Sequence, residues 1–240
     1  MLSRLRSYLL TNADQTQENS ISSEQRKKRF GFFLEYCKEL NKPLKIIDLG
    51  GSDYYWKQLN MTDNRDFEIL ILNNENQNTD SFSNIKFMKK DVRNLDFIKD
   101  KEYDLVYSNS LIEHLNSFED QKKLANEIKR IGKRFFIQTP NYYFPVEPHF
   151  LFPFFQFLSV EMKTKLISKY DMGWYKKQTD FVNAKELAES IRLLKENELK
   201  DIFSGCKIYK EKYYFLTKSI IANSYQHGTF QNRISFGKAD

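Results

Sequence analysis

The sequence has few cysteines, and this limits which covalent or metal frameworks the chain can build. Only Cys37 and Cys206 occur among 240 residues, and they lie far apart. Without a CxxC pair, neither a disulfide framework nor a cysteine-based zinc site is expected. Cys37 falls on the apolar face of an expected helix, where cysteine acts as a small core residue. A reducing, cytoplasmic compartment fits this cysteine content.

Long apolar runs are also absent. No stretch approaches the roughly 18 uninterrupted apolar residues that a transmembrane helix needs, so none is expected. Arg4 and Arg6 are not followed by an apolar run of the length found in signal peptides, and no such peptide is expected.

The charge of the chain is only mildly unbalanced. Lys and Arg outnumber Asp and Glu by 38 to 32, which gives a net charge of +6. The excess is scattered in short pairs such as Lys27-Lys28 and Lys89-Lys90. A nucleic-acid-binding protein usually concentrates its positive charge in one stripe, so nucleic acid is an unfavoured partner. The balance fits a surface that accepts anionic substrates or a peripheral membrane contact.

Two common nucleotide-binding motifs are missing. The phosphate-binding loop GxxxxGK[ST] does not occur. A nicotinamide-binding turn needs GxGxxG, whereas Gly50-Gly51 is followed by Ser52, Asp53 and Tyr54. A P-loop nucleotidase and a dehydrogenase are therefore both unfavoured.

The sequence does contain an apolar segment that ends abruptly at a glycine pair. Residues 44–49 are predicted as a buried strand, and Gly50-Gly51 follows directly. A buried parallel strand reaches a tight turn in this way at the carboxyl edge of a sheet, where open α/β folds bind ligands. Glycine lets the backbone turn sharply and approach a bound molecule without a Cβ in the way.

Strand and helix patterns alternate along the chain after this first strand. Strands are predicted near 44–49, 67–72, 85–88, 103–107 and 134–138, and helices near 23–40, 53–60, 118–131 and 184–204. The segments 206–209 and 213–222 are predicted as a closing antiparallel pair. The pattern predicts an α/β fold, a Rossmann-like, doubly wound and mostly parallel seven-stranded sheet.

The expected organisation is a single domain with two tails and one insertion. Residues 1–20 are expected to form a loose tail, residues 21–225 the domain, and residues 226–240 an irregular tail. Proline and aromatic residues crowd the segment after the fifth strand, which predicts an insertion over 139–183. Three interpretations of it are open: a lid that excludes water, a pocket for an apolar or sugar substrate, and a patch that contacts membrane lipid. The lid is favoured, because aromatic residues at this density more often form packed cover than an interface. If it were exposed, an apolar patch of this size would imply a partner.

Several polar motifs at strand ends carry a resemblance to a known family. Asp48-Leu49-Gly50-Gly51 resembles the first motif of class I S-adenosylmethionine-dependent methyltransferases, although Ser52 and Tyr54 stand where that motif usually has glycines. The segment 103–114 closely resembles the fourth-strand segment of the methyltransferase-11-like branch, and Gln138-Thr139-Pro140-Asn141 is similar to a bacterial subgroup of it. The resemblance covers residues 40 to 222.

The resemblance implies S-adenosylmethionine as cofactor and assigns residues to its parts. Gly50 and Gly51 are expected to let the backbone reach the methionine portion, and Asp48 is expected either to orient the turn or to bind the ammonium group of the methionine. Asn73 and Glu75 are expected at the ribose hydroxyls, with Glu75 preferred. The remaining cofactor-binding residues implied are Asp91 and Val92 at the adenine, together with Asn109 after the fourth strand.

Histidine is the first place to look for a base, because its pKa lies near neutrality. The sequence has three: His114, His149 and His227. His149 lies in the insertion beside Glu147 and is expected to act as a base or to bind the substrate. His114 is a second catalytic candidate, with packing against the cofactor loop as the alternative. His227 receives no role. A Glu/His metal site is an open alternative, but no spacing demands one, and no metal ligand is assigned.

These observations predict an enzyme that methylates an oxygen or nitrogen atom of a small-molecule, glycan or lipid-linked acceptor. The alternative is a non-catalytic protein of the same fold that binds a partner through its aromatic insertion. The sequence leaves the acceptor and the oligomeric state open.

Overall fold

The computed structural model describes residues 2–14, 17, 20–38, 40–75 and 82–224. His227 and the tail expected over 226–240 lie outside these residues. No helix among the described residues has the length and apolar character needed to cross a membrane.

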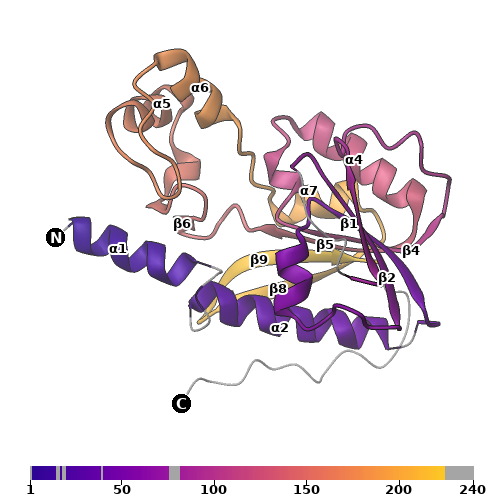
Figure 1. The fold of residues 1–240 in the computed structure, drawn as a ribbon. Coiled ribbons are helices and arrows are strands. Elements are labelled where there is room, and N and C mark those ends of the chain that lie inside the picture. Colours follow the sequence, from indigo (N-terminus) through magenta and orange to yellow (C-terminus); the bar gives the residue numbers. More distant parts are fainter. Residues whose placement is uncertain (1, 15–16, 18–19, 39, 76–81, 225–240) are drawn as a thin grey trace.

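A seven-stranded sheet with strand order β3-β2-β1-β4-β5-β9-β8 forms the centre of the molecule (Figure 1). The strands β1 to β5 run parallel, and β9 is antiparallel to both β5 and β8. Their bounds are β1 (Leu44–Leu49), β2 (Phe67–Asn73), β3 (Ile85–Lys89), β4 (Tyr103–Asn109), β5 (Gly132–Pro140), β8 (Lys207–Tyr213) and β9 (Leu216–Asn223). The predicted doubly wound, mostly parallel seven-stranded fold is confirmed.

The register of the central strands brings three chain exits together. Leu49, the last residue of β1, is paired with Leu72 of β2 and with Ser108 of β4. Because the strands are parallel, the residues that follow them emerge at the same edge of the sheet. Gly50, Asn73 and Asn109 therefore lie side by side.

Helices cover both faces of the sheet and each closes an apolar core. On one face, α4 (Phe118–Ile131) and α7 (Glu196–Ile202) pack against residues such as Ile47 and Val106. On the other, α2 (Ile21–Cys37) and the short α3 (Asp53–Gln58) pack against Ile46 and Tyr107. Neighbouring strand residues serve opposite faces because side chains alternate along a strand.

The core beneath α2 is built largely from aromatic rings. Phe33 of α2 meets Tyr107 edge-on with 4.9 Å between ring centroids, and Tyr107 stacks on Phe136 at 5.8 Å. Trp56 of α3 is fully buried beside them. Cys37 is buried in the same core, as expected for a small apolar residue. Such ring pairs add to the free energy of burial and fix where α2 lies.

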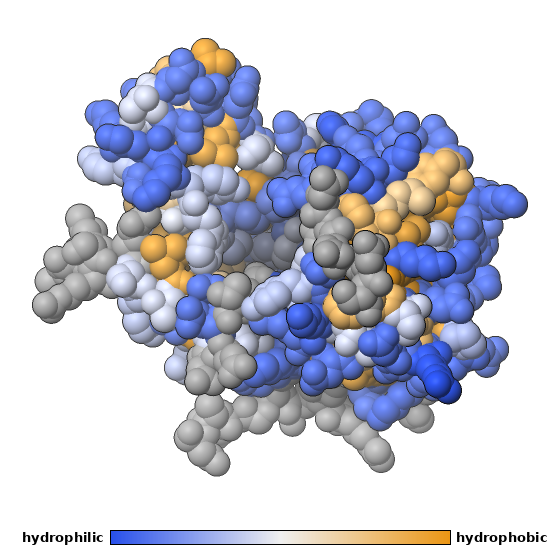
Figure 2. Space-filling view, in the orientation of Figure 1, coloured by the Kyte–Doolittle hydropathy of each residue, from blue (hydrophilic) through white to orange (hydrophobic). Residues whose placement is uncertain are grey.

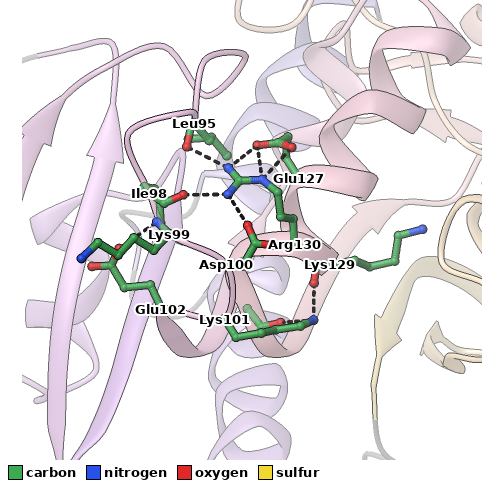
Figure 3. Close-up of polar contacts among 10 residues, drawn as sticks. Leu95, Ile98, Lys99, Asp100, Lys101, Glu102, Glu127, Lys129 and Arg130 are labelled. Atoms are coloured by element: carbon green, nitrogen blue, oxygen red, sulfur yellow. Dashed lines mark hydrogen bonds and ion pairs between the residues drawn. The ribbon is translucent and has the colours of Figure 1, made fainter.

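Arg130 of α4 anchors the loop that leads into β4 (Figure 3). Its guanidinium donates hydrogen bonds to the carbonyl oxygens of Leu95 and Ile98 at 2.9 and 2.7 Å. It also pairs with Asp100 and with Glu127. These contacts hold the residues before β4 against the helix that follows it.

Residues 141–195 form a lobe beside the carboxyl end of β5 (Figure 1). This lobe, called the insertion from here on, extends beyond residue 183, where the sequence-based prediction placed its end. Its elements are the two-residue strands β6 (Val146–Glu147) and β7 (Phe152–Pro153), the 3-10 helix η2 (Phe155–Phe157), α5 (Val160–Lys169) and α6 (Phe181–Glu189). It has a core of its own, in which Phe150, Phe155 and Ile167 are buried. Figure 2 shows hydrophobic surface on this lobe as well.

The structure corrects two expectations about helices. Residues 2–13, expected as part of a loose tail, form α1 (Leu2–Ala13). The single helix expected over 184–204 is two helices, α6 and α7. The segment between them is not helical, because its backbone bonds to residues near the end of β4 and in α4. The Arg192 amide donates to the Glu113 carbonyl, and the Arg192 carbonyl accepts from the Gln121 side chain. Leu194 is fully buried there.

Candidate active site

The loop after β1 has no room for side chains at its two glycines. Gly50 has a φ of +76°, and a Cβ there would lie 2.7 Å from Leu111 Cδ1. A Cβ on Gly51 would lie only 1.7 Å from Asp48 Oδ2. The packing of this loop therefore requires glycine at both positions. Both glycines are half-exposed at the edge of the sheet.

Asp48 lies beneath this loop and shapes it. Its side chain is buried, and Oδ2 accepts a hydrogen bond of 2.8 Å from Trp56 Nε1. Its other oxygen, Oδ1, has no hydrogen-bond partner among the described residues. Burial raises the pKa of Asp48 to about 7, although the bond from Trp56 opposes this shift.

Asn73 links the ends of β1 and β2. Its Nδ2 donates to the carbonyl oxygens of Gly50 and Gly51 at 3.3 and 2.8 Å, and its Oδ1 accepts from the Glu75 amide. The Asn73 side chain is thus committed to holding the loop. Glu75 is exposed, and within the described part of the chain no side-chain partner of its carboxylate is recorded. Its oxygens are available to accept bonds from a ligand.

The other expected cofactor residues have protein partners. Asp91 is exposed after β3 and accepts hydrogen bonds of 3.0 Å from Arg93 Nε, and these bonds lower the pKa of Asp91. Val92 is half-buried and packs against the core beneath α4. Asn109 Oδ1 accepts from the Arg29 guanidinium, which reaches it from α2.

The two candidate catalytic histidines meet in a cluster with two glutamates. His114 ends the 3-10 helix η1 (Ile112–His114) after β4, and its ring lies edge-on to that of His149 with 4.9 Å between centroids. His149 Nδ1 is 2.7 Å from Glu147 Oε1, and His149 Nε2 is 4.0 Å from Glu113 Oε1. The sequence alone predicted His114 and His149, and the fold brings them together.

The electrostatics of the cluster follow from burial and from its paired charges. Glu113 is fully buried, and burial raises its pKa even though the neighbouring His149 opposes this. Burial alone would lower the pKa of His149, but the hydrogen bond and the charge of Glu147, together with Glu113, raise it. The cluster therefore favours a positive charge at His149.

A cavity of about 490 Å³ opens where the two N-terminal helices, the end of β5 and the insertion meet. Ser110 and Gln138 form its wall at the sheet edge, and the Ser110 hydroxyl donates to Gln138 Oε1 at 3.0 Å. Most of its wall is apolar, with Pro140, Phe144, Val146, Leu151 and Trp174. Its size suits a small molecule.

Three cationic side chains also line this cavity. Arg29 pairs with Glu211 through two bonds of 2.8 Å. Arg26 lies over the Tyr55 ring, with 5.0 Å from Cζ to the ring centroid. Burial, with a further contribution from Arg29, lowers the pKa of Lys218 to about 8. For Arg26 and Lys218 no ion pair is recorded among the described residues.

Comparison with known proteins agrees with this architecture. Residues 60–134 match the model of the methyltransferase-domain family. The resemblance to class I methyltransferases is confirmed. The first motif lies outside the matched segment, so its atypical glycine pattern did not contribute to the match. The match to this family implies S-adenosylmethionine as the cofactor and supports the prediction that the protein is a methyltransferase.

Individual relatives are distant. Rv1509, an uncharacterized protein of Mycobacterium tuberculosis, is 35% identical over 60 residues, which are 25% of this chain and 20% of that protein. The match thus spans about a fifth of that relative's length. Among solved structures, the CurJ carbon methyltransferase has a TM-score of 0.53 at 10% identity, covering 93% of this chain and 68% of that one. A S-adenosylmethionine-dependent methyltransferase from Aquifex aeolicus has a TM-score of 0.49 at 11% identity, covering 92% and 98%. At such identities the CurJ likeness shows the fold alone.

The residues at the sheet edge fit S-adenosylmethionine. The loop at Gly50 and Gly51 presents backbone without side chains, and Glu75 offers a carboxylate to hydroxyl groups. Asp91 follows the next strand, where its carboxylate is exposed beside Arg93.

Sequence reasoning gave no role to several residues that the structure places at the site. They are Arg26, Arg29, Glu113, Thr139 and Lys218. The adjacency of Glu113 and His114, and the two-residue spacing of Glu147 and His149, were the signals available for the cluster. The cationic residues come from distant segments, and no local pattern marks them.

Proposed function

We propose that this protein transfers a methyl group from S-adenosylmethionine to an oxygen or nitrogen atom of a small-molecule, glycan or lipid-linked acceptor. One observation carries the proposal. The glycine loop follows β1, the Asn73–Glu75 segment ends β2, and Glu113 and His114 of the histidine cluster follow β4; these parallel strands end at one edge of the sheet. His149 reaches the cluster from the insertion. The cavity of about 490 Å³ meets the same edge at Ser110 and Gln138.

The cofactor, when bound, supplies a methyl group on a sulfonium, whose carbon–sulfur bond breaks with its electron pair left on sulfur. The protein has to hold the acceptor atom in line with that bond and to exclude water. The apolar wall of the cavity, including Phe144 and Leu151, serves the exclusion of water. We assign uptake of the acceptor's proton to the histidine cluster, because His149 is adjacent in the chain to Pro148, which lines the cavity.

The lining of the cavity indicates an acceptor with an anionic group and an apolar portion. Arg26 and Lys218 supply positive charge to which the described residues give no ion-pair partner. Apolar side chains from the insertion lie across the cavity from the N-terminal helices. Charge-assisted hydrogen bonds to an anion would satisfy these cations. An anionic glycan, a lipid-linked phosphate or an amphipathic acid has this chemistry.

Binding of the cofactor is the first test. Titration calorimetry of the chain with S-adenosylmethionine is expected to give saturable heat. Asp91→Ala should weaken binding by about 1–3 kcal/mol, the cost of a lost hydrogen bond to a charged group. Asp96→Ala, an exposed carboxylate in the same loop, is the matched control and should bind as the unaltered chain does. Unchanged affinity in Asp91→Ala would remove that residue from the site.

His149→Ala is expected to lower methyl transfer about 100-fold or more while changing cofactor affinity little. His149 is held by Glu147 and lies in the cluster rather than at the glycine loop. Cell extracts are incubated with isotope-labelled methyl donor, and the labelled product is identified by mass spectrometry and quantified for each variant. His227→Ala serves as the control. Equal transfer by His149→Ala and the unaltered chain would leave His149 with a structural role.

The exposed rings of the insertion favour the second candidate, a non-catalytic protein that binds a partner. Phe154 is 57% exposed, Phe157 48% and Trp174 50%. Rings exposed to this extent are typical of contact surfaces. The calorimetric titration decides between the candidates, because absence of heat at millimolar cofactor contradicts methyl transfer and leaves partner binding.

A further inference from the structure

One oxygen atom of the histidine cluster is buried without a hydrogen bond. Glu113 is 0% exposed, and its Oε2 accepts a 2.9 Å bond from the Thr139 hydroxyl. Its Oε1 has no hydrogen-bond partner among the residues that the structure describes, and it faces His149 Nε2 at 4.0 Å, which is too long for a hydrogen bond. Unsatisfied buried polar atoms are rare in folded proteins, and each indicates a missing partner or a function.

We propose that Glu113, His114 and His149 bind a divalent transition-metal cation. One oxygen or nitrogen atom from each residue lies within 4.8 Å of the others. Ligand atoms on opposite sides of such an ion are about 4.2 Å apart, given bonds of about 2.1 Å. Small rotations of the side chains therefore close the site. Glu113 and His114 come from η1 and His149 from the insertion, so the cation joins the lobe to the sheet edge.

Glu147 prepares His149 for this role. Its Oε1 lies 2.7 Å from His149 Nδ1, and its Oε2 accepts the backbone amides of His149 and Phe150 at 2.8 and 2.7 Å. In the neutral ring, with Nδ1 protonated toward Glu147, the lone pair of His149 is on Nε2, which faces Glu113. A cation bound at Nε2 would take the place of the second proton that the two glutamates favour there. A histidine that binds a metal usually donates its other nitrogen to a carboxylate in this way.

The ligand types select the class of cation. Two imidazoles and one carboxylate suit Zn²⁺, Mn²⁺, Fe²⁺ or Co²⁺, whereas Ca²⁺ and Mg²⁺ prefer sites built from oxygen. Three protein ligands leave at least one coordination position open, as in catalytic rather than structural sites. If the proposed function holds, that position would bind the acceptor's oxygen or nitrogen atom and ease the loss of its proton. Binding of the cation itself does not depend on that function.

The test is a Co²⁺ titration of the full-length, chelator-treated protein, followed by visible absorption and then by displacement with Zn²⁺. We expect one equivalent of Co²⁺ to bind, with absorption bands of a coordinated ion. Glu113→Gln, which keeps the side-chain shape, should weaken binding at least 100-fold, since it removes the charged ligand. Glu147→Gln, which acts through His149, should weaken it 10- to 100-fold.

Two variants control for unspecific binding and one measurement controls for folding. Glu189→Gln removes an exposed carboxylate at the end of α6, and His227→Ala removes the third histidine. Both should bind Co²⁺ as the unaltered chain does. Circular dichroism verifies that each variant is folded, and Co²⁺ should raise the melting temperature of the unaltered chain but not that of Glu113→Gln.

Three outcomes would overturn the inference: no stoichiometric binding at millimolar Co²⁺, equal binding by Glu113→Gln, or loss of binding in His227→Ala. Neither S-adenosylmethionine nor an acceptor is used in this titration. The cofactor titration is run separately with chelator present. Failure of metal binding alone therefore leaves the proposed methyl transfer standing, and absence of cofactor heat alone leaves the metal site standing.

Discussion

Gly51→Ala is expected to abolish binding of S-adenosylmethionine and to destabilise the protein by about 3 kcal/mol or more, at the upper end of overpacking costs. The new methyl group would lie 1.7 Å from Asp48 Oδ2. Asp48 cannot turn away freely, because it is buried and bonded to Trp56, which is itself fully buried. The loop must therefore move, and with it the backbone that we propose binds the cofactor. Urea denaturation and calorimetry measure the two effects.

Gly31→Ala is the matched control for this prediction. Gly31 lies within α2, and a Cβ added there meets nothing within 4 Å. Alanine is a better helix former than glycine, so this variant should be more stable by up to about 1 kcal/mol. Equal stability and cofactor affinity of the two glycine variants would show that the packing of Gly51 against Asp48 does not constrain the loop.

A double variant shows whether Asp48 is the cause. Asp48→Ala removes the atoms that the new methyl group would strike, so Gly51→Ala should cost much less in that background. The difference between the two costs is the coupling energy of a double-mutant cycle. A coupling near zero would mean that the loop, not Asp48, rejects the side chain.

Arg29→Met is expected to lower the free energy of unfolding by about 3–5 kcal/mol, the usual cost of breaking a buried ion pair. The Arg29 side chain is 11% exposed and its partner Glu211 is 3% exposed. Removing Arg29 leaves the Glu211 carboxylate buried, and among the residues described by the structure Ser219 is then its remaining side-chain hydrogen-bond donor. The bond from Arg29 to Asn109 is lost as well, which removes one link between α2 and the end of β4. Chemical denaturation gives the magnitude.

Two comparisons make the result specific. Lys200→Met breaks an exposed pair with Glu196 on α7 and should change stability far less. Arg29→Met combined with Glu211→Leu should recover most of the loss, because two apolar side chains then replace two charges. A loss in Arg29→Met no larger than that in Lys200→Met would contradict the importance of the buried pair.

Local patterns were sufficient for the sheet, for a physical reason. A strand that is buried on both faces needs a nearly continuous run of apolar residues. The sequences of β1 and β4 each contain such a run, and this is how they could be recognised. Parallel strands place their carboxyl ends at one edge of the sheet. Gly50, Asn73 and Asn109 follow or end such strands, so they could be expected to lie together. The identity of the fold therefore follows from short-range information.

Contacts between distant segments decided what could not be predicted. The expected helix over 184–204 is interrupted because the Arg192 backbone bonds to Glu113 and Gln121, which a local pattern does not reveal. Likewise α1 contributes Tyr8 and Asn12 to the wall of the cavity, although its sequence resembled a tail.

The glycine loop and the histidine cluster also show which features follow from local sequence and which depend on contacts between distant segments. The sequence by itself determined that a glycine pair follows the first strand and that His114 and His149 are candidates for the chemistry. Only the tertiary structure decided that Gly51 is required by the buried Asp48, and that the unsatisfied Glu113 oxygen faces His149. Side chains far apart in the chain meet only after the layers pack, and the distances and burial that govern their chemistry are set at that step.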